Sequence, residues 1–235
     1  MHGNLPAFQA VLRAIDDEGV DAVWCLGDLV GYGAQPNECV ELADESVDLC
    51  LIGNHDLVVI DQLDIADFSA NAAQAAVWTQ HQLSEEARAY LEKLKPVDEA
   101  QALGLYHASP RDPVWEYVLS AMAADDCLDE MSPRVGAVGH SHVALAFWRK
   151  GDAPTAGAQS EPNSELDLSE DRWLLNPGSV GQPRDGDPRA SWMLLELESW
   201  RATWRRTEYA IDEAAGAIRR AGLPSQLADR LYYGQ

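Results

Sequence analysis

Most histidines of this sequence lie at positions where side chains commonly form a functional site. Five of the six lie beside Gly, Asn, Asp or Ser at the ends of predicted strands, namely His2, His55, His107, His140 and His142. Ligand sites in open α/β sheets gather at the carboxyl ends of strands. The sixth, His81, lies within a helical pattern, and we interpret it as a solvated or capping helix residue. The other five are therefore predicted to share a site.

Short glycine-containing segments carry most of these histidines together with oxygen ligands. They are His2-Gly3-Asn4, Gly27-Asp28, Gly53-Asn54-His55-Asp56 and Gly139-His140-Ser141-His142, and the segment Tyr106-His107-Ala108-Ser109-Pro110 adds a lone histidine. Mixed imidazole and carboxylate or amide ligands suit Mn, Fe, Zn, Co or Ni better than Ca or Mg. Glycine lets the backbone turn tightly, and an i, i+2 histidine pair could reach two neighbouring ions. The segments together predict a transition-metal site.

The order of these segments resembles the calcineurin-like metallophosphoesterase superfamily, and most closely its small bacterial and archaeal phosphodiesterases. That family's pattern runs D-x-H, GD, GNH[DE], a lone H and GHxH, and the resemblance covers nearly the whole chain. It implies an α/β fold, a four-layer α/β/β/α sandwich with two mixed sheets, as one domain over residues 1–235. It also implies two divalent transition metals, manganese first among Mn, Fe, Zn, Ni and Co, and a hydroxide that bridges them.

The resemblance further implies a role for each site residue. Asp28 would bridge both metals, His2 and His142 would bind the first, and Asn54, His107 and His140 would bind the second. As catalytic residues, His55 would act on the leaving-group oxygen and Asp56 would orient the His55 ring. Two metals ~3.5–4 Å apart can activate a bridging water and clamp the phosphoryl oxygens, so a protein nucleophile is not needed.

Two arginines are candidates for contact with the substrate phosphate. Arg184 ends the stretch Asn176-Pro177-Gly178-Ser179-Val180-Gly181-Gln182-Pro183-Arg184, which resembles a segment that follows GHxH in this subfamily. A guanidinium there could bind a phosphate oxygen. Equally, the stretch could be a tight structural loop, with Arg184 paired to Asp185 or Asp187. Arg111, which follows Ser109-Pro110, is a second candidate.

The N-terminus departs from the family pattern. The pattern begins Asp-x-His, but here x is Met1, so the Asp and the strand that leads into it are absent. We interpret the chain as N-terminally truncated, either by a start site placed at an internal methionine or by a real loss. A real loss would leave unpaired backbone groups and an unfilled slot in the core. His2 would then lie on a fraying terminus, and the first metal site would be weak.

Periodicity and capping signals predict alternating helices and strands. Helices are expected over 5–18, 37–44, 70–95 with a break near Ser84, 212–221 and 225–233. Strands are expected over 21–26, 47–52, 103–107, 135–138, 143–149, 173–175, 191–197 and 203–209. Residues 151–170 have little apolar content and are predicted to form a flexible surface loop. The alternation is typical of an α/β protein with a partly parallel sheet.

The amino-acid composition limits which binding partners and which cellular location we expect for this protein. The formal net charge is −22, with 39 acidic and 17 basic residues of which three are lysine. Such a surface repels a nucleic-acid backbone. It indicates either adaptation to high salt, which we favour because lysine is scarce, or the acidity of a GC-rich genome. Neither a signal peptide nor a membrane span is recognisable, and the four cysteines form no C-x-x-C pair, so we expect a cytoplasmic protein with reduced thiols.

The sequence as a whole favours a metal-dependent phosphoester hydrolase, and within that class a phosphodiesterase that acts on small or nucleotide phosphoesters. A protein phosphatase or a diadenosine-polyphosphate hydrolase of the same superfamily is the alternative within the class. A catalytically impaired binding module is the alternative outside it, because the first metal-ligand Asp is absent. The sequence leaves the natural substrate, the native metals and the oligomeric state open.

Overall fold

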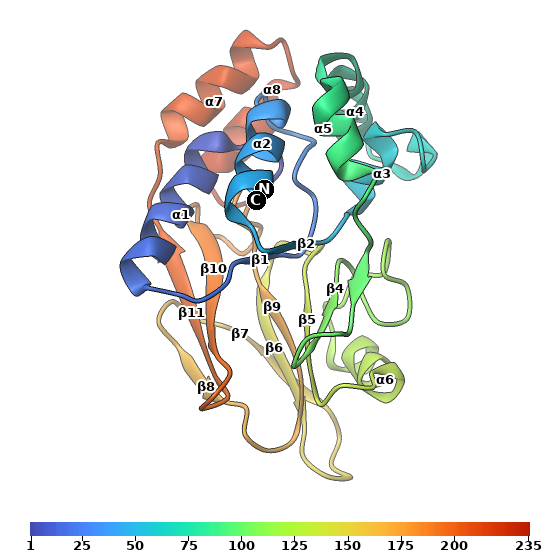
Figure 1. Cartoon of the computed structure of the whole chain (residues 1–235), viewed down its shortest axis with the longest axis vertical. Helices are drawn as coiled ribbons and strands as arrows, with labels where there is room; N and C mark the ends of the chain where they lie inside the picture. The colour runs from blue at the N-terminus through green and yellow to red at the C-terminus, as the bar shows by residue number, and fades with distance from the viewer.

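The computed structural model describes all 235 residues, which form a mixed α/β fold (Figure 1). The helices are α1 (Leu5–Glu18), α2 (Pro36–Ser46), α3 (Asn54–Val59), α4 (Ala70–Gln82), α5 (Glu85–Leu91), α6 (Ala121–Glu130), α7 (Ile211–Arg220) and α8 (Ser225–Asp229), with short 3-10 helices η1 (Ile65–Asp67) and η2 (Arg230–Tyr232). The strands are β1 (Trp24–Cys25), β2 (Leu49–Cys50), β3 (Val97–Asp98), β4 (Gly104–Tyr106), β5 (Val135–Val138), β6 (Ala144–Arg149), β7 (Ala156–Gln159), β8 (Glu165–Asp167), β9 (Arg172–Pro177), β10 (Ala190–Glu196) and β11 (Arg201–Thr207).

The strands form three hydrogen-bonded sheets. The largest has the order β3-β4-β5-β9-β6-β7 and is mixed, because β4, β5 and β9 run parallel while β3, β6 and β7 pair antiparallel. A second sheet, β10-β11-β8, is antiparallel, and β1 and β2 form a parallel pair of their own. Most helices gather at one end of the molecule, whereas α6 lies beside the six-stranded sheet (Figure 1). The mixed α/β class is thus confirmed.

The division into two mixed sheets is corrected by this topology. β1 has β2 as its only strand neighbour and β10 has only β11, so two strand edges are left without partners. A cavity of about 730 Å³ lies between them, lined by Phe8 and Val11 of α1, Trp24 of β1 and Met193 of β10. The two strands do not pair with each other, so the two sheets stay separate. The four-layer sandwich therefore stays an expectation.

The first helix shows how local sequence sets an element's bounds. The Asn4 side chain accepts a hydrogen bond from the Ala7 N–H at 3.2 Å, and Pro6 stands in the first turn, where its missing N–H costs nothing. Gly19 ends the helix in the left-handed conformation, with φ 68°. The predicted helix over residues 5–18 is confirmed at both ends. Its buried face carries Phe8 and Val11.

The predicted break near Ser84 is also confirmed. Helix α4 ends at Gln82 and α5 begins at Glu85, with Ser84 as the N-cap whose hydroxyl accepts the Ala87 N–H at 3.1 Å. Two acidic residues follow in the first turn of α5, where the helix dipole favours negative charge.

The predicted loop over residues 151–170 is wrong in part, because it contains strands β7 and β8. Strand β7 pairs antiparallel with β6 at the edge of the large sheet, and β8 pairs with β11 at the edge of the small one. Both edge strands expose most of their side chains, so they lack the apolar alternation that marks a half-buried strand. Leu168 of this segment is fully buried, and Leu166 packs partly buried against the same cluster.

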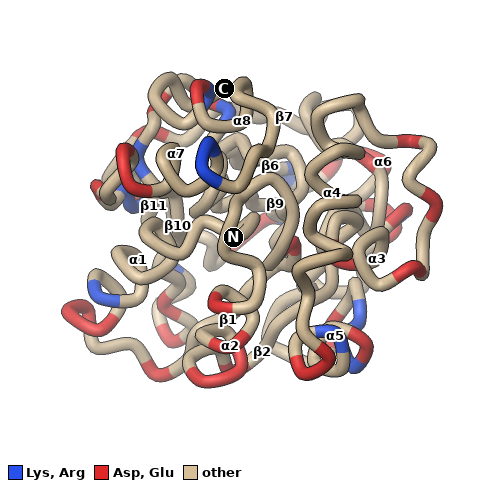
Figure 2. The backbone as a smooth tube through the Cα atoms, turned by 90° about the horizontal axis from the view of Figure 1, so that it is seen from above, with Lys and Arg blue, Asp and Glu red and all other residues tan.

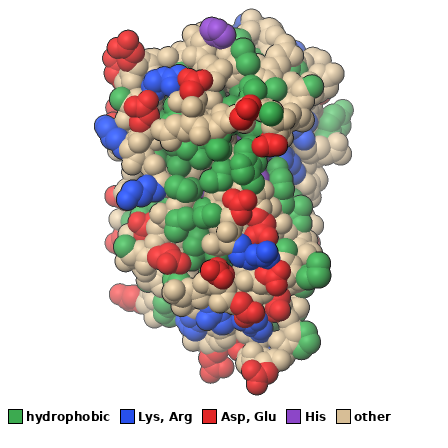
Figure 3. Space-filling view, turned by 90° about the vertical axis from the view of Figure 1, so that its right-hand side faces the viewer, with side chains coloured by type: hydrophobic (Ala, Val, Ile, Leu, Met, Phe, Trp, Pro, Cys, Tyr) green, Lys and Arg blue, Asp and Glu red, His purple; other side chains and the backbone are tan.

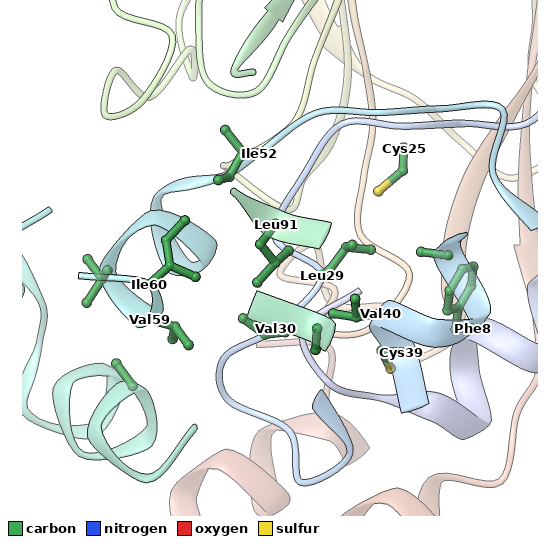
Figure 4. Close-up of a cluster of buried hydrophobic side chains, with 14 residues drawn as sticks. Phe8, Cys25, Leu29, Val30, Cys39, Val40, Ile52, Val59, Ile60 and Leu91 are labelled. Carbon is green, nitrogen blue, oxygen red and sulfur yellow. The ribbon is translucent and has the colours of Figure 1, made fainter. Parts of the chain in front are cut away.

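A hydrophobic cluster fixes the loops that follow β1 and β2. Leu29 and Val30, directly after Asp28, are fully buried against Val40 of α2 and Val59 of α3, and Leu91 of α5 closes the cluster (Figure 4). Burial of each such side chain stabilises the fold by about 1.5–3 kcal/mol. The residues that flank Asp28 are therefore held by core packing, which positions its carboxylate.

The acidic residues are spread around the molecule and do not gather in one patch in the view of Figure 2. None of the helices has the length and apolar composition that a membrane crossing requires.

A buried ion pair between Arg206 and Asp185 leads to a stability prediction. The two side chains are 4% and 0% exposed, and Asp185 also accepts the Ala144 N–H at 3.2 Å. Arg206→Met leaves a buried carboxylate unpaired and should lower the free energy of unfolding by ~3–5 kcal/mol. Arg201→Met is the matched control, because its pair with Glu165 is half exposed and should contribute only ~0.2–1 kcal/mol.

Urea unfolding of both variants in excess chelator measures the two values without a contribution from bound metal. Equal, small losses for the two variants would show that the buried pair does not hold the β10-β11 sheet to the loop that precedes it.

Candidate metal centre

The five predicted histidine-bearing or carboxylate-bearing segments converge on one place in the fold. Several of the residues that they contribute have a left-handed backbone, with φ 55° at His2, 55° at Asp28, 56° at His140 and 61° at His142. This conformation is uncommon outside glycine. Strained backbone of this kind clusters at functional sites when the surrounding structure holds it in place. All four residues are also at least 94% buried.

The buried side chains form two groups that share one carboxylate. His2, Asp28 and His142 make the first group, and Asp28, His107 and His140 make the second, with ligand atoms within 4.8 Å of one another in each. Oδ2 of Asp28 lies 3.5 Å from Nε2 of His2 and 3.5 Å from Nε2 of His107. Oδ1 of Asp28 accepts the His55 N–H at 3.0 Å. Oδ2 thus faces both groups, as the predicted bridging role requires.

Backbone carbonyls fix the orientation of three of the histidine rings. Nδ1 lies 3.2 Å from the Val30 carbonyl in His2, 2.7 Å from the Leu26 carbonyl in His107, and 2.7 Å from the Gln182 carbonyl in His142. A ring that donates its Nδ1–H to a carbonyl carries its free lone pair on Nε2. Metal-binding histidines are characteristically held by such a second hydrogen bond. The arrangement therefore prepares the Nε2 atoms for ligation.

A further observation shows that this set of donor atoms suits a cation. Nε2 of His2 and Nε2 of His142 lie 2.8 Å apart. With both Nδ1 atoms hydrogen-bonded to carbonyls, two lone pairs face each other across that distance, and a cation between or beside them removes the repulsion. Oδ2 of Asp28 and Nε2 of His140 are likewise buried without a hydrogen-bond partner. Buried polar atoms of this kind call for an ion or a proton.

Burial favours the neutral form of the His2, His140 and His142 imidazoles. Burial lowers the pKa of His2 and of His142 well below the usual value, helped by His142 in the first case and Arg184 in the second. Burial, with His107 nearby, lowers the pKa of His140 to about 3. Burial alone would raise the pKa of Asp28, but the surrounding histidines hold it low. A neutral imidazole beside an ionised carboxylate is the form that binds a metal.

Asn54 is placed beside the second group. Its Oδ1 lies 3.2 Å from Nε2 of His107, and Asn54 is the first residue of α3, directly after Gly53. A Cβ at Gly53 would collide with the carboxylate of Asp28, so the close approach of these two segments requires glycine. The structure thus brings all six predicted ligands together. Whether each binds metal stays a prediction.

The role predicted for Asp56 is corrected by its hydrogen bonds. Its Oδ1 accepts the Val30 N–H at 3.0 Å and its Oδ2 accepts the Gly53 N–H at 2.9 Å, so both oxygens are used by the backbone. The Asp56 carboxylate joins the loop after β1 to the start of α3, and it does not orient the His55 ring. Burial, with Asp28 nearby, raises the pKa of Asp56 to about 6.

The His55 ring is held by aromatic neighbours. The Tyr32 ring centroid lies 4.3 Å away and that of Phe68 lies 4.5 Å away, while Nδ1 of His55 is buried and has no hydrogen-bond partner. Burial lowers the pKa of His55 to about 4. His55 belongs to neither ligand group. Its predicted action on the leaving group stays a prediction.

The two predicted arginines differ in how they are engaged. Arg184 forms no ion pair, since Asp185 pairs with Arg206 and Asp187 pairs with Arg189. Its guanidinium bonds neutral groups, 2.8 Å from Oε1 of Gln182 and 3.2 Å from the Tyr32 hydroxyl.

Arg111, by contrast, lies 2.6 Å from Asp126 and 3.5 Å from Glu116. Because two carboxylates already hold it, Arg111 is the less available of the two arginines for a phosphate.

Several residues around the site were not predicted from the sequence. Tyr32 and Gln182 position Arg184, and Tyr117 stacks on the His140 ring with centroids 4.1 Å apart. Asn176 braces the Gly139-His140-Ser141-His142 loop by donating to the Gly139 carbonyl at 2.7 Å. Gln182 and Asn176 lie in the stretch already singled out, so its glycine-rich composition was the available signal. Tyr117 lies in a loop whose sequence has no such mark.

The comparison with family models places this site in a known class. The model of the calcineurin-like phosphoesterase superfamily domain matches residues 1–199. The chain belongs to the calcineurin-like phosphoesterase superfamily.

Similar proteins cover the whole chain. An uncharacterized protein of Methanocaldococcus jannaschii is 35% identical over 243 residues, a match that spans 100% of this chain and 96% of the relative. The crystal structure of a metallophosphoesterase from Sphaerobacter thermophilus is 40% identical with a TM-score of 0.88, over 100% of this chain and 96% of that one. A hypothetical protein from Pyrococcus horikoshii OT3 shares the fold at 19% identity, with a TM-score of 0.77 and coverage of 100% and 95%.

The relatives align with this chain over nearly their full lengths, so these matches do not support the predicted N-terminal truncation. The unpaired edges of β1 and β10 and the cavity between them nevertheless have the form that a missing strand was expected to leave. The expected fraying of His2 is wrong. The Met1 ammonium and the His2 N–H both donate to the Asp28 carbonyl at 2.8 Å, and the His2 side chain is 2% exposed. Two hydrogen bonds and burial anchor the first residues against the loop that carries Asp28.

Proposed function

We propose that this chain is a metal-dependent hydrolase of small or nucleotide phosphoesters, and that it cleaves phosphodiesters. The observation that carries the proposal is the Asp28 carboxylate, whose Oδ2 faces two separate histidine pairs in a buried site. Two divalent transition metals, manganese first among them, would supply Lewis-acid activation of water and neutralise charge on the phosphoryl group. His2, Asp28 and His142 would hold one, and Asp28, Asn54, His107 and His140 the other.

The chain's own residues then position the substrate. Arg184 would turn its guanidinium from neutral partners to a phosphoryl oxygen, where a charge-assisted hydrogen bond is about twice as strong as a neutral one. His55 would donate a hydrogen bond or a proton from its ring to the leaving-group oxygen, or stabilise the charge that develops there. Phe68 and Tyr32 pack against its ring and keep water from it. We also propose that the protein works in the cytoplasm, since its four cysteines are free.

The proposal is tested by turnover of an aryl phosphodiester. The purified chain, stripped with chelator and reloaded with Mn²⁺, should release p-nitrophenolate from bis(p-nitrophenyl) phosphate, and more slowly from p-nitrophenyl phosphate. The His140→Ala variant, prepared in the same way, should lose most of this activity, which excludes a contaminating enzyme.

A chain that binds two metals per molecule but turns over neither ester would contradict the proposal. That result would favour the impaired binding module instead.

A further inference from the structure

An aromatic wall stands beside the candidate metal centre, on the side of His55 and His140. Tyr117 stacks on the His140 ring with centroids 4.1 Å apart and an interplanar angle of 29°. Phe68 packs against His55, and Trp115 meets Phe68 edge to face with centroids 5.9 Å apart. Trp115 and Tyr117 come from one loop, between β4 and α6, that the metal-ligand motifs do not include. The wall therefore lies against two histidines of the site, His55 and His140.

The loop that carries Trp115 and Tyr117 is fixed by its own hydrogen bonds. Asp112 accepts the N–H groups of Val114 and Trp115 at 3.1 Å each, and Oγ of Ser109 accepts the Asp112 N–H at 2.9 Å. Ser109 in turn donates to Glu116 at 2.5 Å. A loop held in this way presents its aromatic rings without a large entropic cost on binding, which is what a preformed binding site requires.

The exposure of Tyr117 separates this wall from ordinary core packing. One face of the ring covers His140, yet 49% of the residue is exposed, and Leu119 and Met122 nearby are 55% and 79% exposed. Figure 3 shows hydrophobic side chains across the middle of the face on which α3, α4 and α6 lie. A half-exposed aromatic ring beside a polar site is suited to stack on a planar group.

The charges around the wall favour a neutral planar group. The loop's one arginine, Arg111, is paired with Glu116 and Asp126, so it offers no free cation to a second phosphate. Asp112 and Glu116 add negative charge to the loop that carries the two rings. A polyphosphate extension would meet carboxylates here, whereas an uncharged ring would meet aromatic faces.

We propose that Tyr117 and Trp115 form a subsite that stacks on a planar aromatic group, an aryl ring or a nucleobase, attached to the substrate's phosphoryl group. This inference rests on the proposed function for its assignment of the phosphoryl site. Stacking is a binding contribution, so Tyr117 and Trp115 are specificity residues and not catalytic ones.

The test compares three non-hydrolysable anions that differ only in the group on phosphorus. Binding of phenylphosphonate, cyclohexylphosphonate and methylphosphonate to the Mn²⁺-loaded chain is measured by titration calorimetry. An aromatic contact of ~1–1.4 kcal/mol corresponds to about five- to tenfold in Kd. Phenylphosphonate should therefore bind about five- to tenfold more tightly than methylphosphonate. It should also bind more tightly than cyclohexylphosphonate, which is apolar but not planar.

Variants of Tyr117 and Trp115 test whether the aromatic wall causes the preference for phenylphosphonate. Tyr117→Ala should bring the phenyl-to-methyl ratio of Kd close to one and leave the Kd of methylphosphonate unchanged, while Tyr117→Phe keeps the preference. Trp115→Ala should lower the ratio in part. Tyr233→Ala, at a tyrosine that is 64% exposed on the C-terminal segment, is the matched control and should change nothing.

A wild-type ratio near one, or equal weakening of all three anions in Tyr117→Ala, would overturn the proposal, the latter because Tyr117 would then only support His140. These Kd measurements do not depend on whether the chain hydrolyses an ester. A chain that keeps the phenyl preference but hydrolyses no ester would retain the subsite and lose the proposed function.

Discussion

Asp28→Asn should leave the chain folded but unable to hold either metal at ordinary affinity. Both ligand groups take their one negative charge from Asp28, so a neutral amide of the same shape removes that charge from two sites at once. Loss of an outer hydrogen bond alone weakens metal binding by roughly 10–100-fold. Loss of a shared charged ligand should exceed that at both sites. Titration calorimetry with Mn²⁺ measures the two affinities directly.

Thermal unfolding supplies the control for Asp28→Asn. A ligand at about 100 times its Kd stabilises a protein by ~2.7 kcal/mol, so Mn²⁺ should raise the melting temperature of the wild type and not that of the variant. Without metal, the two should melt within a few degrees of each other. His142→Ala should weaken only the first group. An Asp28→Asn variant that keeps one metal at wild-type affinity would show that Asp28 does not bridge the two groups.

His55→Ala should lower turnover by about 10²–10⁴-fold for esters with poor leaving groups while the metal content stays unchanged. His55 belongs to neither ligand group, and its Nδ1 is buried without a partner. The loss should be smaller for bis(p-nitrophenyl) phosphate, because an activated leaving group needs little protonation. The measurement is kcat for an alkyl and an aryl phosphodiester, together with metal content by elemental analysis.

His81→Ala is the matched control for His55→Ala. This histidine is exposed, and its Nδ1 lies 2.7 Å from the Val77 carbonyl on the same helix, so its removal should affect neither turnover nor metal content. If His55→Ala loses a metal, the residue is a ligand and the assignment to the leaving group is wrong. Equal losses for alkyl and aryl esters would point instead to a structural effect on the loop that carries Asn54.

The candidate metal-ligand side chains could be predicted because each lies in a short local sequence motif. A glycine before Asp28, Asn54 and His140 permits the tight turns that bring these residues to one point, and that signal is visible without a fold. The order of the motifs then indicated the family, and the structure brings the same residues together. Helix α1 and the break at Ser84 were predictable for a similar reason, since capping is a local interaction.

The roles of Asp56 and Tyr117 could not be predicted because they depend on tertiary contacts. The neighbour of a histidine in sequence is a natural candidate to orient it, but the Asp56 side chain turns toward the Val30 and Gly53 backbone instead. Tyr117 reaches His140 from a loop more than twenty residues away, and no spacing rule joins them. Contacts of this kind arise from packing and not from sequence periodicity.

The short strands limited the prediction of the sheets. Strands β1 and β2 are two residues each, shorter than the apolar runs that predicted them. The missing partner of β1 and β10, and the cavity between these strands, follow from how the whole chain packs. Strands β7 and β8 were missed because edge pairing depends on backbone hydrogen bonds more than on side-chain pattern.

The most direct test of a metal centre shared through Asp28 is anomalous diffraction from a crystal grown with Mn²⁺. We expect two manganese peaks per chain, ~3.5–4 Å apart as in other two-metal sites. One peak should lie beside His2, Asp28 and His142, and the other beside Asp28, Asn54, His107 and His140. A single peak, or two peaks that do not share Asp28, would contradict the account.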